Sequence, residues 1–409
     1  MDSKLPKNFC ILPFIHLYAK PDGACRLCCM ANDSIGNYNV KFNSIEEVWN
    51  SPEYNEKRRH FLNGERLSEC NECWENEDAG KVSKRQREMQ QWEHVFEQKD
   101  IDNFAHDTHP RYLDLRFGNL CNLKCRMCGV WASSQWEKDI RNLSTTENDP
   151  TVIDAFAQHG DIDKTSTMDW FTNNSLWEEL DNIAKGIEEV YFTGGEPTLI
   201  EEHKFLLNKL RDINPKALIR YNTNLTNVTE DWLKTLQGFD RVRVTASLDG
   251  VGPVNELIRY PSKWHKLEEN FDKLMSIGDN IEPSISCAVQ VLNAPKLSEL
   301  YNWKLQKEKQ FGKHIWLSMN AVFAPTFLDP RLLDYGTRCD IFDEMIAWVA
   351  HDRQKEEIVG MANFILSSYT GDRNEELHKL ANHVTVLDKM RGQDTLATAP
   401  WLKRLQYEK

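Results

Sequence analysis

The sequence lacks the apolar segments that would place a chain in or across a membrane. No run approaches the roughly 18 to 20 apolar residues that span a bilayer. The N-terminal stretch MDSKLPKNFC also lacks the apolar segment of a secretory signal. We therefore expect a cytoplasmic protein with no membrane partner.

An excess of positive charge is also missing. With 50 Lys and Arg against 63 Asp and Glu, the formal net charge is −13. This balance disfavours sequence-independent binding to nucleic-acid phosphates as the main activity. The short basic run KVSKRQR at 81–87 is more typical of a solvated helix face. Nucleic acid is therefore not an expected partner.

Cysteine, by contrast, is concentrated in one part of the chain. Nine of the eleven cysteines lie before residue 129. In a cytoplasmic protein, cysteines clustered in this way indicate metal or redox chemistry rather than disulfides.

The order of apolar segments beyond residue 109 predicts an α/β fold. Strand-like runs alternate with amphipathic helical segments, which is typical of a parallel sheet with crossover helices. Six strands fit a partial, TIM-like (β/α)6 barrel better than a closed eight-fold one. The predicted strands are 112–118, 188–195, 217–224, 241–250, 284–293 and 314–323.

Four units are expected along the chain. A small Cys-rich α+β module (1–78) is followed by a polar helical connector (79–108), the barrel (109–330) and a helical C-terminal extension (331–409). In the module, residues 14–29 predict two short strands joined at Pro21-Asp22-Gly23. Residues 44–64 predict one helix, with Ser44 as its cap, Glu47 three residues later and Gly64 as its stop. The segment 131–174 is a polar insertion to which the sequence assigns no structure.

The stretch CNLKCRMCG at 121–129 places Cys121, Cys125 and Cys128 directly after the first barrel strand. Loops after barrel strands carry the chemistry of such folds. A zinc knuckle or a set of buried free thiols is the alternative, but the spacing is not that of a zinc CxxC pair and no nearby histidine completes the site. Three thiolates can instead hold three irons of a [4Fe–4S] cluster and leave the fourth iron open.

Cys-x3-Cys-x2-Cys after a first strand resembles the signature of the radical S-adenosylmethionine superfamily. The resemblance implies that the amino and carboxylate groups of S-adenosylmethionine chelate the open iron. Electron transfer from the cluster then splits a carbon–sulfur bond and yields a 5′-deoxyadenosyl radical. Met127 occupies a position that is often aromatic in the family, and we expect it to lie against the adenine.

Other stretches resemble further motifs of the same family. Gly194-Gly195-Glu196-Pro197, at the end of the second strand, resembles the GGEP motif; alone it would be an ordinary turn. Its glycines allow close backbone approach, and Glu196 is expected to accept a hydrogen bond from the methionine ammonium.

The motif SLDG at 247–250, at the end of the fourth strand, resembles the S-x-D-G segment of the family. Arg259 matches an arginine that pairs with the methionine carboxylate in related enzymes. The alternative readings are a strand-end turn and a surface arginine. The expected cofactor contacts in this region are Ser247, Asp249 and Arg259. Asn222 and Asn224, at the end of the third strand, are expected to contact the cofactor as well.

The N-terminal cysteines resemble an auxiliary-cluster module of the twitch or SPASM type. The resemblance rests on the stretches PDGACRLCC, IGN, SIEEVWNS and CNEC. It implies that a second [4Fe–4S] cluster with no open iron is held by Cys10, Cys28, Cys70 and Cys73. In known relatives this module follows the barrel, whereas here it precedes the barrel.

A zinc site formed by Cys25-x2-Cys28 and Cys70-x2-Cys73 is the alternative. Residues three apart on a strand point to opposite faces, which would separate Cys25 from Cys28. Zinc would also leave Cys10 without a role. The choice between Cys28 and Cys29 as ligand stays open, although the 18-residue spacing from Cys10 favours Cys28.

The resemblance implies a radical enzyme that abstracts hydrogen from a substrate carbon. The second cluster would accept an electron or help to bind substrate, giving a dehydrogenation or the modification of a peptide or small molecule. A reductant protein such as flavodoxin or ferredoxin is expected as a partner. A zinc- or cluster-binding structural protein and an electron-transfer relay are the alternatives, but neither needs a site for methionine. The sequence identifies no catalytic acid or base.

Overall fold

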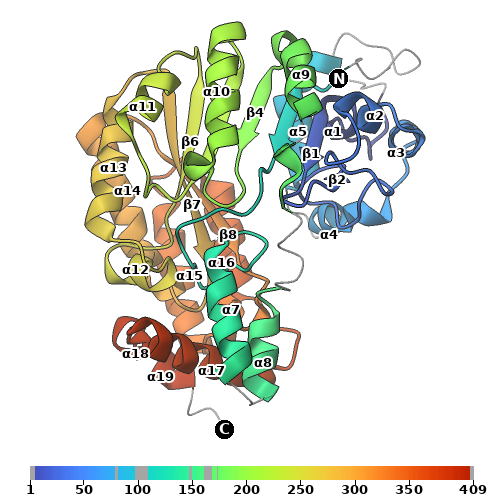
Figure 1. The fold of residues 1–409 in the computed structure, drawn as a ribbon. Helices are drawn as coiled ribbons and strands as arrows, with labels where there is room; N and C mark the ends of the chain where they lie inside the picture. Colours follow the sequence, from blue (N-terminus) through green and yellow to red (C-terminus); the bar gives the residue numbers. More distant parts are fainter. Residues whose placement is uncertain are drawn as a thin grey trace.

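The centre of the protein is one eight-stranded sheet with the strand order β2-β1-β3-β4-β5-β6-β7-β8 (Figure 1). The computed structural model describes residues 5–78, 82–96, 109–146, 150–160, 168–172 and 174–405. Every neighbouring pair of strands is parallel except β1 and β2. No helix in these ranges is both long and apolar enough to cross a membrane.

All six predicted barrel strands are present, most of them shorter than predicted. Helices connect them in sequence, as the parallel order requires. The fold class, a partial barrel of mixed α/β structure, is therefore confirmed. The strands are β3 (Tyr112–Leu115), β4 (Glu189–Phe192), β5 (Leu218–Thr223), β6 (Val242–Ser247), β7 (Ile281–Val289) and β8 (Trp316–Ala321). The connecting helices are α9 (Asn174–Ile183), α10 (Glu201–Ile213), α11 (Glu230–Leu236), α12 (Pro253–Ile258), α13 (Trp264–Ser276) and α14 (Leu297–Phe311).

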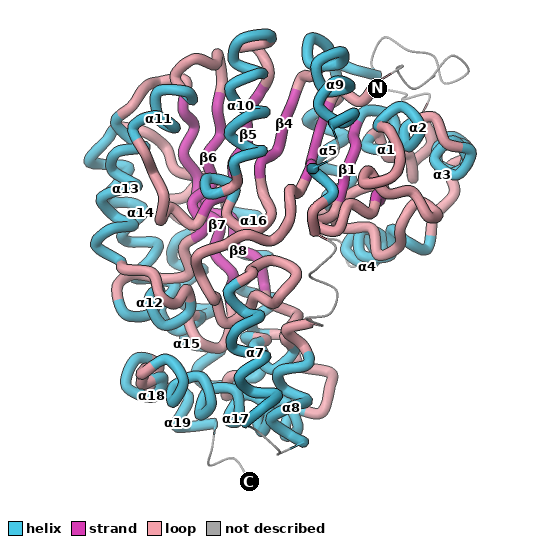
Figure 2. Tube along the Cα trace, in the orientation of Figure 1, coloured by secondary structure: helices cyan, strands magenta, loops and turns pink. Residues whose placement is uncertain are grey.

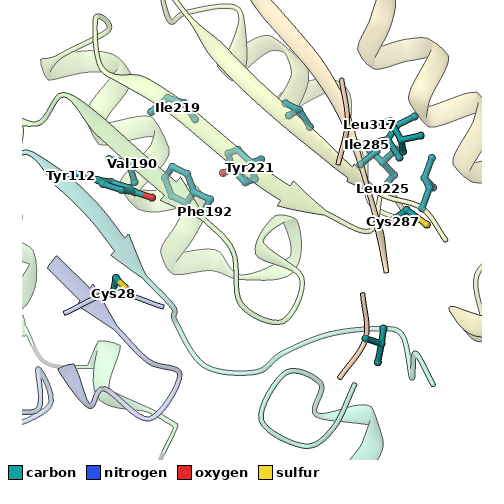
Figure 3. Packing of buried hydrophobic residues seen from close by; sticks show 14 of the residues in the cluster. Cys28, Tyr112, Val190, Phe192, Ile219, Tyr221, Leu225, Ile285, Cys287 and Leu317 are labelled. Atoms are coloured by element: carbon teal, nitrogen blue, oxygen red, sulfur yellow. The ribbon is translucent and has the colours of Figure 1, made fainter. Parts of the chain in front are cut away.

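The two faces of the sheet differ in polarity. On β5 and β6 buried residues alternate strictly with half-exposed ones. Ile219, Tyr221 and Val244 belong to the apolar core, where Figure 3 shows Ile219 and Tyr221 near Phe192. The opposite face carries polar side chains such as Arg220 and Thr245. The barrel therefore has an apolar outer layer and a polar inner wall.

The N-terminal module extends the barrel sheet. Its strands β1 (His16–Ala19) and β2 (Cys25–Arg26) form the antiparallel pair that the sequence predicted around Gly23. Strand β1 also pairs in parallel with β3, with His16 opposite Tyr112. Figure 2 shows β1 beside the barrel strands. The sequence did not predict this pairing, because its local pattern does not say which strand lies beside which.

The prediction of one helix over residues 44–64 was wrong. The segment forms α2 (Ile45–Trp49) and α3 (Pro52–Leu62). Ser44 forms the expected capping box with Glu47, but Ser51 then caps a second helix that begins with Pro52. Proline has no N–H to continue the hydrogen bonds of α2, and it suits the first turn of a new helix.

The remaining segments are helical. The insertion forms α7 (Gln135–Thr146) and α8 (Pro150–Ala157), and α8 packs against α17 of the C-terminal extension. The connector contains α5 (Lys84–Gln91) and α6 (Glu93–Phe96), while residues 79–81 and 97–108 of that prediction lie outside the described residues. The other helices are α1 (Leu12–Ile15), α4 (Asn71–Asp78), α15 (Tyr335–Trp348), α16 (Lys355–Leu366), α17 (Arg373–Arg391), α18 (Thr395–Thr398) and α19 (Leu402–Leu405).

The buried Arg58 joins three helices of the N-terminal module. Its Nε donates to the carbonyl of Pro13 at 2.8 Å, and its Nη1 donates to the carbonyl of Trp49 at 2.7 Å. The guanidinium also lies over the rings of Trp49 and Tyr54. One planar group thus holds α1, α2 and α3 together.

We expect Arg58→Lys to lower the free energy of unfolding by about 1.5 to 3 kcal/mol, because an ammonium cannot serve both carbonyls and stack between the rings. The matched control is Arg59→Lys on the exposed face of the same helix, which should change stability by less than about 0.5 kcal/mol. Chemical denaturation of both variants measures the difference. Equal stabilities would show that Arg58 does not hold the module together.

Candidate functional site

The motifs singled out in the sequence meet at one edge of the sheet. The three-cysteine loop follows β3, GGEP follows β4, Asn224 follows β5 and SLDG begins at the end of β6. Because these strands are parallel, their carboxyl ends lie side by side, and ligands bind there in folds of this class. The topology therefore gathers segments that are more than a hundred residues apart.

Backbone hydrogen bonds hold the three-cysteine loop on two sides. On one side the N–H of Glu196 donates to the carbonyl of Leu120 at 2.8 Å. On the other side the N–H groups of Lys124 and Arg126 donate to the carbonyls of Tyr260 and Ile258 at 2.6 and 2.8 Å. The loop thus lies between the GGEP segment and the end of α12.

The three thiols of this loop shift one another's pKa values. The Cys128 thiol donates to the Cys125 sulfur, which lowers the pKa of Cys125 and raises that of Cys128. Burial, followed by the nearby Cys125, raises the pKa of Cys121 to about 12. The positive charge of Arg259 adds to the lowering of the pKa of Cys125 and opposes the rise in the pKa of Cys128. The three cysteine side chains also pack in one cluster with Leu123 and Met127.

Gly195 is required by the cysteine loop itself. A methyl group at this position would lie 2.1 Å from the carbonyl oxygen of Leu120. Gly194 has φ +131°, a conformation that L side chains rarely adopt. Close approach of this backbone to a ligand stays a prediction, and the group that the structure places against Gly195 is the cysteine loop.

Glu196 is completely buried and already bonded to the protein. One carboxylate oxygen accepts from the N–H and the hydroxyl of Thr198 and from the hydroxyl of Thr223. The other accepts from the N–H of Asn224 at 2.7 Å. Burial raises the pKa of Glu196, while these hydrogen bonds oppose the rise. The carboxylate joins the ends of β4 and β5, and its second oxygen keeps room for one more donor.

Asn224 contacts the cysteine loop directly. Its amide nitrogen lies 3.8 Å from the Cys121 sulfur and 3.0 Å from the side-chain oxygen of Asn122. Asn222 and Ser247 instead lie on the half-exposed inner wall. Met127 packs against the cysteine cluster. Pro197 begins a short 3-10 helix that follows Glu196.

Arg259 and Asp249 form a buried ion pair. The guanidinium Nη2 donates to Oδ1 of Asp249 at 3.0 Å, and Nε lies 2.8 Å from Oδ2. Asp249 also accepts from the N–H of Ala288. Burial raises the pKa of Asp249, and the arginine opposes that rise. Asp249 thus orients Arg259 beside the cysteines. The pairing of Arg259 with a methionine carboxylate stays a prediction.

The structure also brings four N-terminal cysteines together. Burial raises the pKa of Cys10, and nearby Cys70 and Cys73 raise it further. Burial likewise raises the pKa of Cys28, with added effects from Cys29 and Cys10. Cys70 has a pKa raised by burial and then by Cys28. The four thiols of the proposed ligand set are therefore neighbours in the fold.

Cys25 makes a contact of its own at the turn before β2. Burial raises the pKa of Cys25 to about 12. Its thiol lies 3.7 Å from the carbonyl of Gly23. Within the described ranges, no three His, Cys, Asp or Glu side chains are grouped so as to hold a single metal ion.

Several residues that build the site were missed in the sequence. Thr223 and Thr198 hold Glu196, and Asn293 donates to the backbone carbonyl of Asp249 at 2.7 Å. Trp136 donates to the carbonyl of Cys125, and a ring nitrogen of His159 bonds to the carbonyl of Cys128. Burial lowers the pKa of His159 to about 4. Apart from Thr198 and Thr223, which lie beside predicted motifs, no sequence signal marks these positions.

Comparison with known proteins agrees with this arrangement. Residues 115–286 match the Radical SAM superfamily, and residues 10–74 match SPASM, an iron–sulfur cluster-binding domain. No curated protein matches the chain.

Two of the solved structures that show some likeness to the chain are those of native anSMEcpe and Streptococcus suis SuiB. Native anSMEcpe with bound AdoMet is 22% identical, with a TM-score of 0.38, over 57% of this chain and 59% of that one. Streptococcus suis SuiB bound to the precursor peptide SuiA is 14% identical, with a TM-score of 0.37, over 59% of this chain and 46% of that one. The chain spans 52 to 59% of the length of the anSMEcpe chains that it matches.

The two matched families explain both groups of cysteines. The radical SAM family implies a [4Fe–4S] cluster and S-adenosylmethionine, and the SPASM family implies auxiliary iron–sulfur binding, which agrees with the expected cofactors. The thiols that the structure brings together lie within the two matched ranges. Residues 115–286 of this chain thus match the radical SAM superfamily, and the SPASM match at residues 10–74 precedes them in the sequence.

Proposed function

We propose that this protein is an enzyme that cleaves S-adenosylmethionine reductively and removes a hydrogen atom from a carbon of a peptide or small-molecule substrate. The observation that carries the proposal is that the loop of Cys121, Cys125 and Cys128 is hydrogen-bonded to the GGEP backbone at the carboxyl ends of the strands. When bound, the cluster and S-adenosylmethionine would supply the 5′-deoxyadenosyl radical.

The chain's own residues would hold and orient these groups. The three thiolates would each bind one iron, and the charge of Arg259 favours the deprotonated form of Cys125 and Cys128. The free acceptor capacity of Glu196 suits the methionine ammonium. Asn222, Asn224, Ser247 and Met127 remain proposed contacts of the cofactor.

The inner wall of the barrel is the proposed substrate surface. Arg220, lying over the ring of Tyr191, and Arg116, lying over Tyr18, supply guanidinium groups on this wall. Thr245 and Ser284 share a hydrogen bond of 2.8 Å further along the strands. A polar wall of this kind suits a substrate that carries hydrogen-bonding groups, such as a peptide.

The N-terminal module would hold the auxiliary cluster at the edge of the same sheet. Strand β1 connects the module to β3, the strand that leads into the three-cysteine loop. This continuity supports a role in electron acceptance or substrate binding for Cys10, Cys28, Cys70 and Cys73. A reductant such as flavodoxin or ferredoxin would supply the electron that starts the reaction.

We expect Cys125→Ala to lose about four irons per chain, the content of one cluster, and to form no 5′-deoxyadenosine with dithionite and S-adenosylmethionine. The wild-type protein, purified without oxygen, should hold about eight irons and form this product. Cys339→Ala, outside both groups of thiols, is the matched control. A wild-type protein with both clusters that does not cleave S-adenosylmethionine would favour the electron-relay alternative.

The auxiliary ligand set is tested by comparing two cysteines that are three residues apart. Cys28→Ala should lose about four irons, whereas Cys25→Ala should keep them, because Cys25 is not in the proposed ligand set and its thiol lies 3.7 Å from the carbonyl of Gly23. Iron, sulfide and zinc per chain are measured in both variants. Loss of one zinc in each variant, with no loss of iron, would establish the zinc site instead.

We expect Gly195→Ala to displace the cysteine loop, since the added methyl group would meet the carbonyl of Leu120. The free energy of unfolding should fall by about 1 to 3 kcal/mol, and the iron of the three-cysteine site should be lost. Gly360→Ala on α16, where nothing lies within 4 Å, is the control and should keep the iron. Full iron content in Gly195→Ala would contradict the role assigned to this glycine.

A further inference from the structure

Two helical segments enclose the three-cysteine loop on the side away from GGEP. The first is the insertion that contains α7 and α8, and the second is the C-terminal pair α17 and α18. They share an apolar cluster formed by Val130, Trp136, Leu143, Val152, Phe156 and Leu387. We call these two segments the outer support of the loop.

The outer support donates hydrogen bonds to three carbonyls of the loop. The Ser133 hydroxyl donates to the carbonyl of Leu123 at 2.5 Å, and Nε1 of Trp136 donates to that of Cys125 at 3.0 Å. Nδ1 of His159 bonds to the carbonyl of Cys128. Fixing a carbonyl fixes its peptide plane, and two of these planes begin at cysteines of the site.

The geometry determines which nitrogen of His159 carries the proton. A carbonyl oxygen can only accept, so Nδ1 of His159 must be the donor. The ring is stacked on Trp136, with centroids 4.1 Å apart, and is fully buried, which favours its neutral form. Its Nε2 then accepts from Nε2 of His383 on α17, at 3.1 Å. The C-terminal extension thereby holds the tautomer that donates to Cys128.

The two basic side chains of the loop are also bound to the outer support. The fully buried Arg126 donates to Asp388 at 2.8 Å and to Gln393 at 3.1 Å. Lys124 donates to Asp139 at 2.6 Å, and Asp139 also accepts from Arg391 of α17. Contacts to main chain and side chains therefore converge on the same eight-residue loop.

We propose that Trp136 and the pair His159–His383 are positioning residues that orient the Cys125 and Cys128 thiolates toward their iron–sulfur cluster, and that the C-terminal extension thereby controls how firmly the cluster is held. The proposal rests on the proposed function, because it requires a cluster at these cysteines. Apolar packing alone would not require hydrogen-bond donors aimed at the carbonyls of two ligand residues.

The test compares His159→Phe with His159→Asn in the full-length, reconstituted protein. Phenylalanine keeps a ring against Trp136 and removes the donor, whereas the asparagine amide can replace the Nδ1 donor. His203→Phe is the matched control, since His203 is equally buried and bonds to a backbone carbonyl, that of Leu115, outside the cysteine loop. The readouts are the rate of iron loss to a chelator without oxygen and the change in the cluster's electron paramagnetic resonance signal on adding S-adenosylmethionine.

We expect His159→Phe to lose the iron of this site about ten-fold faster than the wild-type protein and to show an altered signal. His159→Asn should restore the wild-type rate to within about two-fold, and His203→Phe should leave the signal unchanged. Should His159→Phe fail to fold, Trp136→Phe, which keeps a ring and loses the donor to Cys125, decides by the same readouts.

Two outcomes separate the proposals. A wild-type protein without a signal that responds to S-adenosylmethionine would overturn the proposed function and, with it, the basis of the inference. A wild-type protein with that signal, together with an unchanged rate and signal in His159→Phe, would overturn only the inference. Failure of asparagine to rescue a folded His159→Phe defect would also overturn it.

Discussion

The whole site depends on one backbone contact, the hydrogen bond from the Glu196 N–H to the carbonyl of Leu120. The contact is possible because Gly195 has no side chain to strike that carbonyl. It joins the loop after β3 to the end of β4, and Glu196 continues the connection to β5 through Thr223 and Asn224. The carboxyl ends of three strands are thereby locked together around the cysteines.

Buried charged side chains lie near this contact, and each of them is paired or hydrogen-bonded. The carboxylate of Glu196 and the pair Asp249–Arg259 lie on two sides of the cysteine loop, and each charge has several partners. A buried charge without partners would cost several kcal/mol, so these groups need the fold as much as they support it. The result is a rigid frame in which thiols keep fixed directions, as a cluster with one open iron requires.

The N-terminal module and the C-terminal extension attach to this frame from different sides. The module adds β1 to the sheet beside β3, while the extension packs α17 against α8 and the outer side of the cysteine loop. Figure 1 shows α17, α18 and α19 of the extension at the lower end of the molecule and α1, α2 and α3 of the module at the upper right. Both contact the segment that runs from β3 to Cys128, the module through β1 and the extension through Asp388.

The sequence by itself determined the barrel strands, the capping box at Ser44 and the groups of cysteines, because strand periodicity, capping and ligand spacing are local patterns. It failed at Pro52, where the apolar pattern continued but the missing N–H ended one helix and began another. Only the tertiary structure decided that β1 joins β3, that Cys10 lies near Cys70, and that His383 reaches His159. Such contacts join residues far apart in the chain or depend on side-chain direction, and they form only when the strands and helices are packed together, so no local pattern encodes them.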